Sequence, residues 1–271
     1  MGTSQTIRYL KQSATYKIFS GILKELYKFT ETLGKIIIWG GETFKFILKG
    51  QINLHEVSEQ CYRFGITSLP ITLSIVGMTS VIVASQVAPE MVKQGGSNFV
   101  GLLMSILIVR EVAAVMSGFA IISMIGSSIA AEIATMKVTS QIDAIKVLEV
   151  NPIRYLFVPR VLSGILMMPV ITIISGLIGI IAGAVTSNLS ANLSFMAFFD
   201  SAWLGIYMKD LGVSLLKAVS FGGTIALISC CVGYDADGGA KGVGLATTKA
   251  VVWSFVAIVI WDMIFAMTFF F

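Results

Sequence analysis

Residues 161–199 read VLSGILMMPVITIISGLIGIIAGAVTSNLSANLSFMAFF and contain no charged side chain over 39 positions. An α-helix rises about 1.5 Å per residue, so about 20 apolar residues span the hydrocarbon core of a bilayer. The stretch is therefore longer than one span needs. Its polar part, residues 186–194 (TSNLSANLS), predicts a surface loop that ends a span over residues 161–186.

Four other stretches have the same apolar character. No charge occurs over the 26 positions between Arg63 and Glu90, and a long helix over residues 98–131 is interrupted only by Arg110-Glu111. Lys217 and Asp262 are the single interruptions of two later stretches. We therefore predict an all-α integral membrane protein with five spans, at about residues 66–88, 98–131, 161–186, 211–232 and 250–271.

The composition of the whole chain agrees with this class. Of 271 residues, 56% are hydrophobic and 13% are charged, whereas soluble domains carry about a quarter charged residues. So few charges exclude a soluble enzyme, a nucleic-acid-binding protein and a disordered chain. Three cysteines and the single His55 form no disulfide or metal-ligand pattern, so no metal site is predicted. The polar, basic residues 1–17 do not resemble a signal peptide.

The distribution of lysine and arginine gives the orientation. With the N-terminus in the cytoplasm, 15 of the 19 basic residues lie in cytoplasmic segments and two lie in outer loops. The positive-inside rule therefore predicts a cytoplasmic N-terminus and a C-terminus on the other side. The chain divides into a cytoplasmic N-terminus, residues 1–63, and a transmembrane domain, residues 64–271, with cytoplasmic loops 132–160 and 233–249.

An amphipathic helix is predicted in the N-terminal region. Ile22, Leu26, Phe29, Leu33 and Ile36 recur at helical spacing, and lysines occupy the other face. Such a helix suits the cytoplasmic headgroup layer of the membrane. The alternative is a soluble helix that packs on a partner.

The loop 132–160 predicts a second amphipathic helix, between the second and third spans. Val138, Ile142, Ile145 and Leu148 share one face. Residues 140–143 (SQID) fit a capping box at the helix start, and Asn151-Pro152 stops the helix. From the spacing alone, two roles are open for this helix. A cytoplasmic protein could bind it and so move the spans, or it could be a connecting helix that rests on the bilayer.

At this point the sequence resembles a family. EIATMKVTSQIDA (132–144), NPIRYLFVPR (151–160) and GYDADGGAKGVGLATTKAVV (233–252) are similar to the cytoplasmic signatures of the MlaE/YrbE permeases, and Arg110-Glu111 matches an Arg-Glu pair of that family. The chain departs from the family pattern at Ala113-Ala114, in place of Gly-Pro, and at Met124, in place of an arginine.

The resemblance implies the membrane subunit of an ABC transporter that moves phospholipid or another lipid in a bacterial inner membrane; a plastid inner envelope is the less favoured location. It implies a homodimer, a separate ATPase subunit that binds ATP and Mg, and an extracytoplasmic MCE-domain protein that exchanges the lipid. This chain has no GxxxxGK[ST] loop and is not predicted to be an enzyme or to bind a cofactor. The segment 136–151 would be the coupling helix on the ATPase, and the residues assigned to this coupling element are Glu132, Lys137, Ser140, Asp143, Lys146, Glu149 and Arg154.

The intramembrane charges are the second candidate site. A charge exposed to lipid costs at least about 2.5–3.5 kcal/mol, so Arg110, Glu111, Lys217 and Asp262 should face protein or a wet cavity. They either lock the helices as ion pairs or line a lipid path, in which Arg110 or Lys217 attracts phosphate. Gly179 and Gly183 form a GxxxG pattern that permits close helix contact, within the chain or in a dimer.

Two other functions fit an apolar, five-span chain. An ion-gradient-coupled secondary transporter or channel would use Glu111 or Asp262 as a proton site. A membrane scaffold would recruit a partner through the loop 132–160 and move nothing. Dependence on a separate ATPase distinguishes these alternatives from an ABC permease.

Overall fold

The computed structural model describes residues 14–269, and the side chains of residue 27 and residues 30–269. This part of the chain is helical and contains no strand. In chain order its elements are α2 (Ala14–Leu48), α3 (Leu54–Tyr62), η1 (Arg63–Thr67), α4 (Leu69–Lys93), η2 (Ser97–Phe99), α5 (Val100–Leu107), η3 (Ile108–Val112), α6 (Ala113–Ile121), η4 (Ile122–Gly126), α7 (Ser127–Val138), α8 (Gln141–Val147), η5 (Ile153–Phe157), α9 (Val158–Ala191), α10 (Phe195–Gly205), α11 (Met208–Tyr234) and α12 (Gly239–Phe269).

Five helical segments within residues 14–269 are long and apolar enough to cross a membrane, which confirms the predicted fold class. Every segment is longer than the span predicted for it, because the helices continue beyond the predicted ends. The first runs without a break through the predicted domain boundary at residue 63. Their bounds are Leu54–Lys93, Ser97–Val138, Ile153–Ala191, Met208–Tyr234 and Gly239–Phe269.

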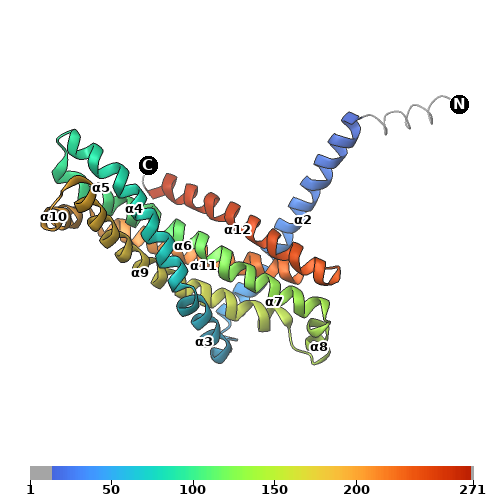
Figure 1. Ribbon diagram of the computed structural model, residues 1–271. Helices are drawn as coiled ribbons and strands as arrows, with labels where there is room; N and C mark the ends of the chain where they lie inside the picture. Colours follow the sequence, from blue (N-terminus) through green and yellow to red (C-terminus); the bar gives the residue numbers. More distant parts are fainter. Residues whose placement is uncertain (1–13, 270–271) are drawn as a thin grey trace.

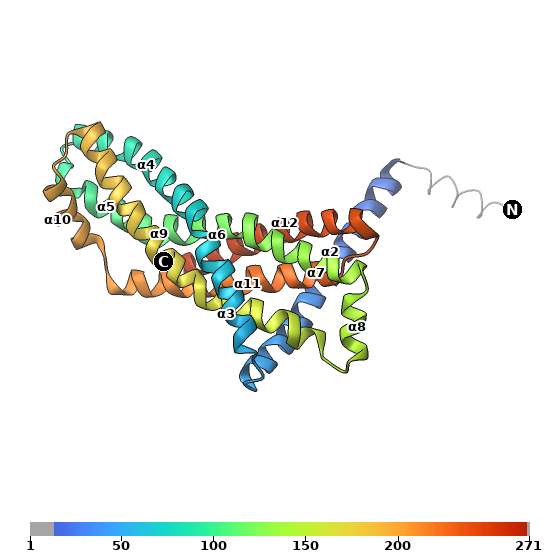
Figure 2. The same ribbon diagram turned by 60° about the horizontal axis from the view of Figure 1, so that its bottom comes forward.

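The segments form an elongated bundle with α8 at one end and α10 at the other (Figures 1 and 2). The basic-residue distribution predicts that the α8 end faces the cytoplasm. α9 packs against α4 and α11, and α11 belongs to the most buried of the five segments. One apolar core surrounds Phe157 and Phe221, and a second core near α10 contains Met104 and Phe198.

The second span is a composite helix with two π-helical turns. The first turn, η3, holds Arg110 and Glu111, and the second, η4, holds Met124. The continuous helix predicted for residues 98–131 is confirmed, and it extends to Val138. π-Turns interrupt the regular ladder and occur often at functional sites. The charged pair therefore lies where the helix backbone is already irregular.

The predicted surface loop at residues 186–194 is wrong in its first part, because α9 continues to Ala191. Thr186 Oγ1 donates to the Ala182 carbonyl oxygen at 2.8 Å, so this polar side chain is satisfied inside the helix. The helix ends at Asn192, which has a left-handed backbone (φ 53°). Ser194 then caps α10, accepting from the Ala197 N–H at 3.2 Å.

The N-terminal helix exists as α2, and its first half extends away from the bundle (Figure 1). Ile22, Leu26 and Phe29 belong to the predicted apolar face, but their side chains lie outside the described set. Farther along, Ile36, Trp39 and Ile47 pack against the core around Phe157. The second half of α2 is thus attached to the bundle by apolar contacts.

Close backbone contact between α9 and α11 depends on two glycines. A Cβ added at Gly164 would lie 2.5 Å from the Gly222 carbonyl oxygen. The GxxxG pair makes similar contacts within the chain: a Cβ at Gly179 would lie 2.8 Å from Ser80 Oγ, and one at Gly183 would lie 3.3 Å from Met104. Both glycines are buried, so of the two alternatives left open by the sequence the structure shows the contact within the chain.

We predict that Gly164→Ala lowers the free energy of unfolding by about 1–3 kcal/mol, because the added methyl group meets backbone that cannot rotate away. The thermal unfolding midpoint of the purified chain in detergent measures this change. Gly212→Ala in α11 is the matched control, since a Cβ there meets no atom within 4 Å, and it should not lower the midpoint. Equal midpoints for the two variants would contradict the packing argument.

Candidate functional site

Lys217 is fully buried in α11, and its ammonium group is surrounded by oxygen atoms. Lys217 Nζ lies 2.7 Å from Asp262 Oδ1 and 3.0 Å and 3.1 Å from the two carboxylate oxygens of Glu111. It also donates to the Arg110 carbonyl oxygen at 3.1 Å. The three charged side chains come from η3, α11 and α12, so this cluster joins three spans. Three of the four predicted intramembrane charges therefore lie together.

Arg110 makes a different ion pair. Its guanidinium bonds Asp210 Oδ2 at 2.8 Å and 2.9 Å, and the Asp210 side chain is only 4% exposed. A pocket of about 250 Å³ opens beside this pair, lined by Arg110, Tyr207, Lys209, Asp210 and Phe269. The pocket has two cationic side chains, one carboxylate and two aromatic rings. It lies toward the α10 end of the bundle, where α11 begins and α12 ends.

At the opposite end, α8 is a two-turn helix between two sharp corners. Ser140 before it and Glu149 after it both have a left-handed backbone with φ of 60°, which is uncommon for residues other than glycine. The predicted capping box is wrong, because Ser140 makes no side-chain cap bond. Asp143 instead accepts from Lys146 Nζ at 3.1 Å. Asn151 also does not end this helix; its side chain caps η5 by accepting from the Ile153 N–H at 2.9 Å.

The exposed side chains of α8 and of the corner that follows it include both charged and apolar ones. Asp143 and Lys146 are exposed, and Val147 and Leu148 are 83% and 74% exposed. The hydrogen bond from Lys146 holds the pKa of Asp143 below its ordinary value, and the same bond, followed by the nearby Tyr234, raises the pKa of Lys146. Both groups are therefore charged at neutral pH. An exposed helix with this surface can bind a complementary groove.

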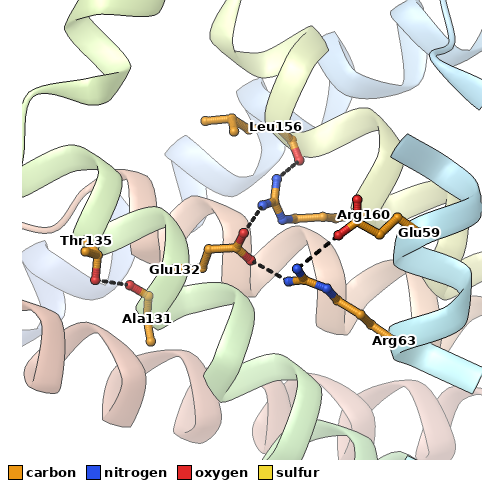
Figure 3. A network of polar contacts seen from close by, with 7 residues as sticks. All are labelled: Glu59, Arg63, Ala131, Glu132, Thr135, Leu156 and Arg160. Atoms are coloured by element: carbon orange, nitrogen blue, oxygen red, sulfur yellow. Dashed lines mark hydrogen bonds and ion pairs between the residues drawn. The ribbon is translucent and has the colours of Figure 1, made fainter. Parts of the chain in front are cut away.

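Glu132 was predicted to belong to the coupling element, and the structure places it in α7, before the helix α8. Figure 3 shows its carboxylate between two arginines, Arg160 from α9 at 3.1 Å and Arg63 from η1 at 3.4 Å. Arg63 also pairs with Glu59 at 3.1 Å, and Arg160 donates to the Leu156 carbonyl oxygen at 2.8 Å. This network connects the first, second and third spans near the end of the bundle at which α8 lies.

The remaining residues of the predicted coupling element are spread over three elements. Lys137 is in α7, with its Nζ 5.9 Å from the centre of the Tyr234 ring. Arg154 is exposed in η5, and Glu149 forms the corner after α8. Of the seven residues, Asp143 and Lys146 belong to α8 itself, and the others flank it.

The structure adds residues that sequence reasoning missed. Asp210 precedes the fourth charge-free stretch by one residue, and that position was the signal for a partner of Arg110. Arg63 and Arg160 each border a charge-free stretch, but nothing local links them to Glu132. No charge or periodic spacing in the sequence pointed to Tyr234, although side chains from several elements contact its ring.

Sequence comparison adds the family. The family described as Permease MlaE matches residues 57–268, which reach from the first membrane-spanning segment to the fifth. The chain belongs to the MlaE permease family. A probable ABC transporter permease of Synechocystis sp. is 39% identical over 220 residues, 81% of this chain and 84% of that protein. A probable ABC transporter permease of Rickettsia typhi is 34% identical over 237 residues, 88% and 92% of the two chains.

A plant protein is also similar. The Arabidopsis thaliana protein TRIGALACTOSYLDIACYLGLYCEROL 1, chloroplastic, is 34% identical over 236 residues, 86% of this chain and 67% of that protein. The resemblance in the cytoplasmic signatures is thus confirmed at the level of the family. This MlaE-family chain is a multi-pass membrane protein.

We predict that Lys217→Met destabilises this MlaE-family permease by about 3–5 kcal/mol, because Glu111 and Asp262 then face each other without a cation. The triple variant Lys217→Met/Glu111→Gln/Asp262→Asn removes all three charges and should recover most of the loss. Thermal unfolding in detergent compares the two. If the single variant were as stable as the triple variant, the ammonium would not be holding these spans together.

Proposed function

We propose that this chain is the membrane-spanning subunit of an ABC transporter that moves phospholipid or a related lipid. In this proposal a separate ATPase subunit supplies the energy, and an extracytoplasmic MCE-domain protein delivers or receives the lipid. Membership of the MlaE permease family carries the proposal, together with the relatives named as probable ABC transporter permeases.

The geometry of α8 supports a docking role. The helix lies at the end of the bundle that the basic residues assign to the cytoplasm, and it exposes Asp143, Lys146 and Val147. Its two neighbours, α7 and η5, continue directly into the second and third spans. A force applied to α8 by an ATPase would therefore reach both spans, and Glu132 would pass it to the first span through Arg63.

ATP and Mg belong to the partner in this proposal. The chain has no phosphate-binding GxxxxGK[ST] loop. The glycines near residues 238–244 lie in a turn and the start of α12, without the strand that such a loop follows. The chain's own part is to bind the ATPase, enclose the lipid and change shape.

A lipid cargo agrees with two observations. The Arabidopsis thaliana relative is named after a glycolipid, trigalactosyldiacylglycerol. The pocket beside Arg110 offers Lys209 and the Tyr207 ring at the end opposite α8, and cations beside aromatic rings suit a lipid headgroup. We place Arg110, Glu111 and Asp262 along the lipid path, with Arg110 nearest a phosphate, and the fully buried Lys217 would hold the two carboxylates in place.

Assembly and location complete the proposal. The exposed apolar side chains of α12, such as Val252, Val256 and Val259, would face lipid or a second copy of the chain. Two copies would enclose a cavity for the lipid, lined by the second and fifth spans. The membrane would be a bacterial inner membrane with the N-terminus in the cytoplasm. The plant relative named as chloroplastic makes a plastid inner envelope the alternative.

An ion-coupled transporter is the second candidate, and the Lys217 cluster is the observation that favours it. Intramembrane carboxylates such as Glu111 and Asp262 mark proton relays in many carriers. Dependence on ATP separates the two functions. The purified complex in liposomes should transfer fluorescent phospholipid to an acceptor only when ATP is present, and transfer driven by a pH gradient alone would favour the carrier.

We predict that Asp143→Lys or Lys146→Asp uncouples ATP hydrolysis from lipid transfer, because either change places like charges against the ATPase groove. Transfer should fall roughly tenfold or more while hydrolysis continues. The double swap Asp143→Lys/Lys146→Asp is the control, since it keeps the ion pair within α8. Recovery in the double swap would mean that the pair only stabilises the helix. Normal transfer in both single variants would refute coupling through these residues.

A further inference from the structure

Tyr234, the last residue of α11, lies where four other elements meet. Its ring is 5.2 Å from the Trp39 ring of α2 and 5.9 Å from the Phe157 ring of η5, both edge to face. Trp39 and Phe157 are themselves 6.2 Å apart, with perpendicular rings. Three aromatic side chains from distant parts of the sequence thus form one cluster, and such pairs are more stable than their buried area alone implies.

Two lysines complete the surroundings of the ring. Lys146 Nζ of α8 lies 5.8 Å from the ring centre, and Lys137 Nζ of α7 lies 5.9 Å from it. Both distances fall within the range of about 6 Å over which a cation is attracted to an aromatic face. The elements before and after the Ser140 corner are therefore both held to the same ring.

α8 has few other attachments to the bundle. Ile142 is fully buried in the core around Phe157, whereas the other α8 side chains are half-buried or exposed. Lys146 follows Ile142 by four residues and so lies on the same face of the helix, one turn later. A helix held only at Ile142 could rotate about that point. The contact of Lys146 with Tyr234 supplies a second fixed point and sets the direction of α8.

The same region fastens α2. Lys35 of α2 pairs with Asp235, the residue after Tyr234, at 2.6 Å, and this bond raises the pKa of Lys35. Glu42 of α2 accepts from Asn151 Nδ2, just before η5, at 3.2 Å. α2 therefore contacts the ends of both cytoplasmic loops, and the Tyr234 ring lies between α2 and α8.

We propose that Tyr234 is a positioning residue that orients α8 through the Lys146 ammonium and links it to the N-terminal helix α2. The attraction of the ammonium by the Tyr234 ring and hydroxyl is the essential property, because any apolar side chain could pack against Trp39 and Phe157. The orientation of α8 is a property of this chain alone. Its consequence for ATPase docking rests on the function proposed above.

A spin label on α8 tests the orientation directly. The label is placed by Val147→Cys, at a highly exposed position next to Lys146, in a Cys61→Ser background. Cys230 and Cys231 are buried and can stay. The full chain in lipid nanodiscs, without an ATPase, gives the ratio of mobile to immobile label for each variant of Tyr234, Lys146 and Asp143.

Tyr234→Leu should raise that ratio about two- to fivefold, because it keeps apolar bulk and removes the ring face. Lys146→Met should raise it by a similar factor through the loss of the cation, and it leaves the aromatic cluster intact if Tyr234→Leu does not fold. Tyr234→Phe keeps the ring face but removes the hydroxyl, which also interacts with Lys146, so its ratio should lie between those of the parent chain and Tyr234→Leu. Asp143→Asn removes the ion pair within α8 but not the ring contact, so it is the matched control for Lys146→Met.

The outcomes separate the inference from the proposed function. A label that stays immobile in both Tyr234→Leu and Lys146→Met overturns the positioning role, as does an equal increase in Asp143→Asn. Tyr234→Leu, which changes no residue of the proposed docking surface, is then tested for binding of the co-purified ATPase subunit. Mobile α8 with unchanged ATPase affinity upholds the orientation by Tyr234 and counts against α8 as the docking helix.

Discussion

Lys217 Nζ lies within 3.1 Å of both Glu111 carboxylate oxygens and 2.7 Å from Asp262, with no exposure to solvent or lipid. An ammonium group at this depth is tolerated only with such partners. The second, fourth and fifth spans must therefore meet at one level of the membrane. The π-turn η3 presents Glu111 there, and it turns the neighbouring Arg110 toward Asp210. The register of the bundle follows from these two ion pairs, and the glycine crossing of α9 and α11 brings the third span against it.

Ion pairs and aromatic contacts hold the elements together at the α8 end of the bundle. Glu132 joins the first three spans through Arg63 and Arg160, and Tyr234 joins α11 to α2, α7 and η5. These two centres lie on the segments that lead into and out of α8. An exposed two-turn helix would otherwise be loosely placed, since Ile142 alone anchors it in the core.

The five spans could be predicted because lipid excludes charge, and charge-free stretches are visible along the chain. Their ends could not be predicted as well. Thr186 satisfies its hydroxyl within α9, so a polar run that resembled a loop stayed helical. Asp143 bonds Lys146 instead of capping α8, because Ser140 turns into the left-handed region. Glu132 was placed with α8 by its nearness in sequence, whereas its partner Arg63 lies 69 positions away. The pairing of distant side chains leaves no periodic signal, and Asp210 and Tyr234 were missed for the same reason.

The ion pair of Lys35 with Asp235 spans 200 positions of the sequence. During synthesis α2 emerges before the five spans, yet its partners Asn151 and Asp235 emerge only after two and four spans, respectively, have been made. Contacts of such long sequence separation form late, because a long loop must close first. The docking of α2 therefore cannot be completed before α11 has been made. A truncated chain that ends before α11 would keep the contacts of α2 with Phe157 and Asn151 but would lack those with Tyr234 and Asp235.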